Sequence, residues 1–243
     1  MPLEQSEAFI LRTFNVGEQD KIVTFFSIDK GIVKGIAKGA RKFGNRFGSS
    51  LEPLSHIKIY YYEKEHKDLV VISDCDLIES YFELQEHLER GFTLSYFCEL
   101  IEEFTPSHSK DDLLFRLLSS TLQALKAGGD TDFLGAYFEA WILKINGFLP
   151  SFKKCRKCRR EITDSAWLSS KKEGVYCDSC ALKKKEEILP EMDEFIEWIK
   201  KNPPPTHKNL PVPQERLKAV RKTLQDIIIY HMEKEPKSLR FIK

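Results

Sequence analysis

The sequence predicts a mixed β and α protein, in which a small N-terminal barrel or sandwich of strands precedes a helical domain with a cysteine-rich insert. The apolar residues follow a strand-like period up to about residue 78 and a helical period beyond it. Two C-x2-C pairs interrupt the helical part. With 243 residues, 42% of them apolar, the chain is long enough for one large or two small domains. We place the first domain at residues 1–80 and the second at 81–243, with the cysteine module at 153–185.

The first 80 residues contain five segments that are rich in β-branched and aromatic residues and are separated by Gly, Asn, Asp and Pro. The short link 27–31 includes Gly31, which can adopt a positive φ, so we expect the second and third strands to form a hairpin. The expected strands are Ala8–Phe14, Lys21–Ile28, Gly31–Ala37, Leu54–Tyr62 and Leu69–Asp76.

Beyond these strands, apolar residues recur every three or four positions, which indicates amphipathic helices. Ser109 or Asp111 can cap the second helix, and the Gly128-Gly129 pair can end it. The third helix begins near Asp130 and ends near Asn146-Gly147. The expected helices cover residues 97–104, 114–125, 134–145, 192–200 and 214–232.

The charge is distributed unevenly, although 38 basic and 37 acidic residues nearly cancel. Residues 81–152 carry 5 basic and 11 acidic side chains, whereas residues 153–185 carry 11 basic and 4 acidic ones. The total charge therefore gives no argument for a polyanionic partner, and any binding face has to come from a local concentration of charge.

The four cysteines of the insert have the spacing of a zinc site. Cys155, Cys158, Cys177 and Cys180 form two C-x2-C pairs with 18 residues between them. Four thiolates satisfy tetrahedral zinc and leave no position for water, so we predict one structural Zn2+. An iron–sulfur cluster, free thiols or disulfides are the alternatives. Cys75 and Cys98 are expected to be ordinary buried thiols.

Basic residues surround the first cysteine pair and have two interpretations. They can contact a nucleic acid, or they can merely offset the negative charge of a zinc–thiolate centre. The candidate DNA-binding residues of the module are Lys153, Lys154, Arg156, Arg159 and Arg160.

A second basic segment follows the third expected strand and contains glycines and two phenylalanines. Glycines let a backbone approach a sugar–phosphate chain, and basic side chains neutralise phosphates. Phe43 and Phe47 are four residues apart, a spacing that favours anchoring of both rings on the β domain; base stacking is the alternative. The candidate DNA-binding residues here are Lys34, Lys38, Arg41, Lys42 and Arg46.

Residues 9–54 resemble the N-terminal domain of the RecO family of bacterial recombination and repair mediators. The resemblance is carried by an LR-x4-GE-x-D element, an AKGAR segment at residues 37–41 and a basic R-x4-L-x-P element. The matching residues are Leu11, Arg12, Gly17, Glu18, Asp20, Gly31, Arg46, Leu51 and Pro53. Many members of that family also have a helical C-terminal domain with an inserted four-cysteine zinc module.

The resemblance implies an OB fold at the N-terminus and binding of single- and double-stranded DNA. It also implies annealing of complementary strands and help in loading recombinase onto single strands covered by single-strand binding protein. The implied partners are RecR and the C-terminal tail of single-strand binding protein. Lys38, Arg41, Lys42 and Arg46 match the family's basic loop and inherit a role in DNA contact.

Several classes of function lack support in the sequence. The chain has no P-loop, H-E-x2-H or G-x-S-x-G motif, and its six histidines are scattered singly, so we expect no enzyme. The longest apolar runs fall far short of the roughly 20 residues that span a bilayer, and no secretory signal is visible, so we expect a cytoplasmic, nucleoid-associated protein without a membrane partner. A zinc-stabilised protein-interaction adaptor is the alternative function.

Overall fold

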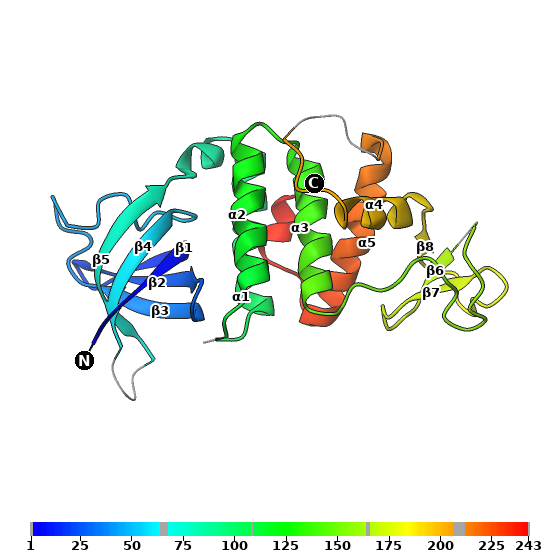
Figure 1. Ribbon diagram of the computed structural model, residues 1–243, viewed down its shortest axis with the longest axis horizontal. Helices are drawn as coiled ribbons and strands as arrows, with labels where there is room; N and C mark the ends of the chain where they lie inside the picture. The colour runs from blue at the N-terminus through cyan, green and yellow to red at the C-terminus, as the bar shows by residue number, and fades with distance from the viewer. Residues whose placement is uncertain (1, 64–67, 108, 164–165, 207–211, 243) are drawn as a thin grey trace. The chain divides into compact units, whose positions relative to one another are not determined.

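The computed structural model describes residues 2–63, 68–107, 109–163, 166–206 and 212–242 (Figure 1). Three of the six histidines, His66, His108 and His207, lie outside this part. The chain forms two compact units: Met1–Arg116 with Ser238–Lys243, and Leu117–Lys237. Among the described residues, no helix has the length and apolar character to cross a bilayer.

The first unit contains five strands that close into a barrel in the order β1-β2-β3-β5-β4 (Figure 1). The hairpin of β2 with β3 is confirmed, because Ser27 pairs with Gly31 and the two strands are antiparallel. Pairing is antiparallel elsewhere too, except that β3 and β5 run parallel where the barrel closes. The bounds are β1 Leu3–Val16, β2 Asp20–Ser27, β3 Gly31–Ala37, β4 His56–Tyr62 and β5 Val70–Glu79.

Strand β1 begins five residues before its predicted start at Ala8, because its first half pairs with β4 and its second half with β2. A register shift between Ile10 and Arg12 lets one strand serve both neighbours. Strand β4 begins at His56, two residues later than predicted, and Leu54 just before it has a positive φ of 62°. Alternating side chains of all five strands fill the barrel with apolar residues, among them Ile10, Phe25, Val33, Ile59 and Ile72.

Helical segments complete the first unit. Helix α1 (Leu88–Phe104) follows a short helix η1 (Phe82–Glu86), and its Glu102 carboxylate lies 2.6 Å from the Arg12 Nε of β1. The Phe115 ring, near the start of helix α2 (Asp112–Lys126), packs 5.0 Å from the ring of Phe9. The Arg12–Glu102 contact joins α1 to the strands, and both belong to the first compact unit.

Two of the helix ends are those that the sequence indicates. The Asp111 carboxylate accepts a hydrogen bond of 2.9 Å from the Leu114 backbone N–H and so caps α2. The Asp130 carboxylate does the same for the Phe133 N–H at the start of α3 (Thr131–Ile145). The second unit also contains α4 (Glu191–Ile199) and α5 (Gln214–Met232), which lie within two residues of their predicted bounds.

The cysteine module lies between α3 and α4 in the chain, as predicted, and has little regular structure (Figure 1). Three short strands form an antiparallel sheet in the order β7-β6-β8. Their bounds are β6 Ala166–Leu168, β7 Val175–Cys177 and β8 Glu187–Ile188. A sheet this small has almost no core, so the module needs another source of stability.

Candidate nucleic-acid interface and metal centre

The basic loop joins β3 to β4 at the surface of the barrel and spans residues 38–55. Its first turn depends on Gly39, which has a φ of +71° and whose backbone N–H donates a 2.8 Å hydrogen bond to the Asp20 carboxylate. The loop therefore leaves the barrel in a fixed direction, beside the start of β2.

Two arginines fasten this loop to neighbouring segments. Arg41 donates from Nη1 to the Gly17 carbonyl at 2.9 Å, and its backbone N–H donates to the Gln19 carbonyl at 2.9 Å. Arg46 donates from Nε to the Ser73 carbonyl at 2.5 Å. Both side chains are nevertheless exposed, so their remaining N–H donors face solvent.

The two phenylalanines of the loop have opposite environments. Phe47 is 2% exposed and packs into the barrel core, which confirms the predicted anchor. The prediction that Phe43 is a second anchor is wrong, because its side chain is fully exposed, at 109% of the reference value. The four-residue spacing would bring the rings together in a helix, but the loop is a series of turns.

Three of the predicted DNA-binding side chains line one surface pocket of about 390 Å3. Lys38, Lys42 and Arg46 contribute to it together with Phe43. Arg41 belongs to the same loop but not to the pocket lining, and Lys34 is exposed on β3. The loop residues Lys38 to Leu51 include no carboxylate, and Asp20 is the acidic residue of the lining.

The polar members of the lining, Gln19, Asp20 and Asn45, were not among the predicted site residues. The side-chain oxygen of Asn45 accepts hydrogen bonds from the backbone N–H groups of Phe47 and Gly48, at 3.0 and 3.2 Å. Asn and Asp are so common in turns that their type alone carries no signal for a site. The available signal was Asp20, which is the last residue of the LR-x4-GE-x-D element.

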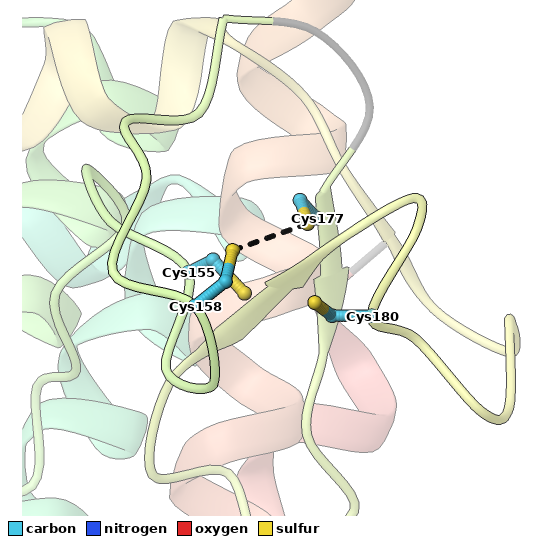
Figure 2. A group of neighbouring side chains, drawn as sticks. All are labelled: Cys155, Cys158, Cys177 and Cys180. Carbon is cyan, nitrogen blue, oxygen red and sulfur yellow. Dashed lines mark hydrogen bonds between the residues drawn. The ribbon is translucent and has the colours of Figure 1, made fainter.

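The four cysteines of the module converge, as Figure 2 shows. Their sulfur atoms all lie within 4.8 Å of one another, and Cys158 Sγ lies 3.8 Å from Cys177 Sγ. Sulfurs at the corners of a tetrahedron about 2.3 Å from a central zinc ion would be about 3.8 Å apart. Cys155 is buried, Cys177 and Cys180 are partly exposed, and Cys158 is exposed.

Backbone hydrogen bonds shape this cluster before any ion is considered. Around the first pair, the Cys155 N–H donates to the Arg160 carbonyl, and the Arg159 N–H donates to the Cys155 carbonyl, both at 2.9 Å. Around the second pair, the Cys180 N–H donates to the Cys177 carbonyl at 2.9 Å. These turns aim both sulfurs of each pair toward the other pair.

The protonation of the cluster matches a cation site. Burial opposes ionisation of Cys155, but backbone N–H groups of Cys158 and Cys177 outweigh it and lower the Cys155 pKa to about 6. A hydrogen bond with the neighbouring Cys177 sulfur, followed by burial, favours the protonated thiol of Cys180 and raises its pKa to about 12. A divalent cation removes this difference, since it deprotonates coordinating thiols. The cluster therefore fits zinc in number, spacing and chemistry.

The five candidate DNA-binding residues of the module fall into two groups. Lys153 Nζ lies 3.3 Å from Glu197 Oε1, and Arg156 Nη1 lies 2.5 Å from Glu173 Oε2, so both charges are partly offset. Lys154, Arg159 and Arg160 are exposed, and they remain candidates for contact with a polyanion.

The two other cysteines are buried, as predicted, and lie outside the cluster. Burial raises the pKa of Cys75 to about 12, and the nearby carboxylates of Asp74 and Asp76 add to the shift. Burial likewise raises the pKa of Cys98 to about 12. Both thiols are therefore protonated and chemically quiet at neutral pH.

Comparison with known proteins gives one consistent result. The family described as recombination protein O, N terminal, matches residues 1–81, and the family described as recombination protein O, C terminal, matches residues 85–240. Together these matches cover nearly the whole chain.

Similar proteins have the same printed name, DNA repair protein RecO. The protein of Koribacter versatilis is 32% identical over 233 residues, which are 96% of this chain and 95% of that protein. The protein of Pelotomaculum thermopropionicum is 29% identical over 100% of this chain and 94% of its own length. The protein of Caldicellulosiruptor saccharolyticus is 28% identical over 81% of this chain and 80% of its own length.

Proposed function

Because the chain belongs to the RecO family of DNA repair proteins, we propose that it binds DNA and anneals complementary strands during recombination repair. In this role it also helps to load recombinase onto single strands that are covered by single-strand binding protein. The observation that carries the proposal is the convergence of Lys38, Lys42 and Arg46 on one pocket of the barrel loop. Three cations side by side neutralise consecutive phosphates of a strand.

Strand annealing also needs a second place to hold DNA. The exposed Lys154, Arg159 and Arg160 of the cysteine module supply it, and they belong to the second unit, whereas the loop belongs to the first. One molecule can then hold two strands at once. Neutralised phosphates repel one another less, so the bases pair without any covalent chemistry. We therefore propose a mediator that is not an enzyme and needs no ATP.

Several finer features belong to the same proposal. The five-stranded barrel is of the OB-fold type, within a nucleic-acid-binding domain of residues 1–80, and residues 81–243 form the helical domain. Zinc held by the four cysteines is structural, since four protein sulfurs leave no open coordination position. The partners are single- and double-stranded DNA, RecR and the C-terminal tail of single-strand binding protein. The protein acts in the cytoplasm, at the nucleoid.

The test of DNA contact is the salt dependence of binding to an unstructured oligonucleotide. Replacing Lys38, Lys42 and Arg46 together by Ala should weaken binding to all sequences alike. It should also flatten the slope of log K against log salt by about 0.7 for each lost phosphate contact on a single strand.

A matched control also removes three positive charges, but outside the loop: the exposed Lys201, Lys218 and Lys222 are replaced by Ala. Its slope should equal that of the wild type. If the loop variant and this control have the same slope, the loop does not contact DNA, and the adaptor function becomes the better one. Arg46 donates a hydrogen bond to the Ser73 carbonyl, so a thermal melt of each variant checks that the protein remains folded without it.

A further inference from the structure

The basic loop presents one aromatic ring entirely to solvent. Phe43 is fully exposed, whereas Phe47, the other phenylalanine of the loop, is 2% exposed. The exposed ring is flanked in the sequence by Lys42 and followed by Arg46, and both line its pocket. This ring does not contribute to the core. Because basic side chains lie beside it, its position suits a ligand with both an apolar face and negative charge.

Phe47 does not offer a second platform. It is 2% exposed, and the Arg46 guanidinium lies over its ring, 4.6 Å from the ring centroid. Phe43 is therefore the ring of this loop that an incoming planar group can reach.

The loop is held in place without a ligand. Hydrogen bonds from Gly39, Arg41 and Arg46 to Asp20, Gly17 and Ser73 attach it to the barrel at several points. The ring is thus carried by a braced segment, so binding requires little ordering of the loop.

We propose that Phe43 is a stacking platform for one unpaired base of single-stranded DNA and gives this loop its preference for single strands over duplex. The inference rests on the proposed function, because Lys38, Lys42 and Arg46 have to hold the adjoining phosphates. Each base in a duplex is already stacked on its neighbours, so only an unpaired base can present its face to the ring. The pocket volume of about 390 Å3 lies within the range of small-ligand sites, about 300–1,000 Å3.

Stacking also makes the contact tolerant of sequence. Every base has a π-face, whereas the amide of Asn45, the loop's candidate for reading base edges, is occupied by backbone groups of its own loop. A platform of this kind suits a protein that handles strands of any sequence.

The experiment compares wild type, Phe43→Ala and Phe43→Trp on three probes: a thymidine homopolymer, the same strand with abasic sites, and a duplex of equal length. Phe43→Ala should bind the homopolymer about tenfold more weakly, as expected for the loss of one base–aromatic stack. Its duplex affinity and its salt slope should match the wild type. Wild type and Phe43→Ala should bind the abasic strand equally. Phe43→Trp should retain the wild-type affinity for the homopolymer.

The control is Phe82→Ala, which removes a phenylalanine that is 51% exposed and lies outside the loop. Unchanged affinity of Phe43→Ala for the homopolymer, with a normal salt slope, overturns the stacking role and leaves the proposed function intact. An equal loss on homopolymer and duplex also overturns it, since the ring would then only support the loop. If the wild type shows no salt-dependent binding of any probe, the proposed function and the inference both fail.

Discussion

Glu139 and Arg221 form a buried ion pair between α3 and α5. Arg221 Nε lies 3.2 Å from Glu139 Oε1, Arg221 Nη1 lies 2.7 Å from Asp132 Oδ1, and Gln225 donates to Glu139 Oε1 at 2.9 Å. Gly135 makes room for this network, because a Cβ there would lie 2.6 Å from Arg221 Nη2. Removal of the fully buried Glu139 would break its contacts with Arg221 and Gln225, and the part-exposed Asp132 would offset the buried Arg221 charge less completely.

Glu139→Ala should therefore lower the free energy of unfolding by about 3 kcal/mol, the low end for a broken buried pair, because Asp132 still offsets part of the Arg221 charge. Glu139→Gln keeps an acceptor for Arg221 and Gln225, so its loss should be smaller. Urea denaturation measures both, and the exposed Glu194→Ala serves as a control with little effect. Equal stability of Glu139→Ala and Glu194→Ala would show that the buried pair contributes nothing.

At the scale of elements, the cysteine module should depend on the proposed zinc ion far more than the helices around it do. Its strands have two or three residues, whereas α3 and α5 bury continuous apolar faces. Because the energy of binding a structural zinc ion is folding energy, about 10 kcal/mol or more, chelation should loosen residues 153–185 and leave the barrel and helices folded.

Thiol alkylation at pH 8 measures this outcome residue by residue. After chelation, Cys155, Cys158, Cys177 and Cys180 should react, while Cys75 and Cys98 should stay unmodified until the protein is denatured. The reason is that burial raises the pKa of the Cys75 and Cys98 thiols to about 12, so almost no thiolate is present at pH 8. Elemental analysis that finds no zinc in protein purified without chelator would contradict the metal assignment.

The elements also show how far the sequence could predict the structure. Strands, helices and the caps Asp111 and Asp130 follow from local patterns, because neighbouring residues decide them. The parallel pairing of β3 with β5 could not be predicted, since it joins Gly35 to Val70 and depends on the closure of the whole barrel. The strands of the module are too short to give a period.

The candidate site was predictable in part, where local spacing or composition identifies its residues. The spacing of the four cysteines identified a cluster that the structure assembles, and the run of basic residues identified a loop whose pocket holds three of them. The prediction that Phe43 is an anchor was wrong because its four-residue spacing from Phe47 cannot distinguish a ring in the core from a ring in solvent. The burial of Glu139 and Arg221 could not be predicted from the sequence, because it depends on the packing of α3 against α5.

At the scale of the whole molecule, annealing should need both basic patches. Ala at Lys38, Lys42 and Arg46 should reduce the acceleration of duplex formation, and so should Ala at Lys154, Arg159 and Arg160. Because each set leaves one patch, either variant should still bind a single strand. The assay mixes labelled complementary strands, naked or coated with single-strand binding protein, without ATP. Normal annealing by the second variant would show that the module does not hold DNA.

The first unit is made from two separate stretches of the chain. Ser238 donates from its backbone N–H and its hydroxyl to Glu99 Oε2, at 2.9 and 2.6 Å, and the Phe241 ring stacks 4.9 Å from that of Phe92. During synthesis, the 121 residues of Leu117–Lys237 leave the ribosome before these contacts can form. Synthesis of these residues at about 5–20 residues per second takes about 6–24 s, and helix α1 lacks its contacts with Ser238 and Phe241 during that time. The barrel can close early, but its unit is completed only after the whole second unit has been made.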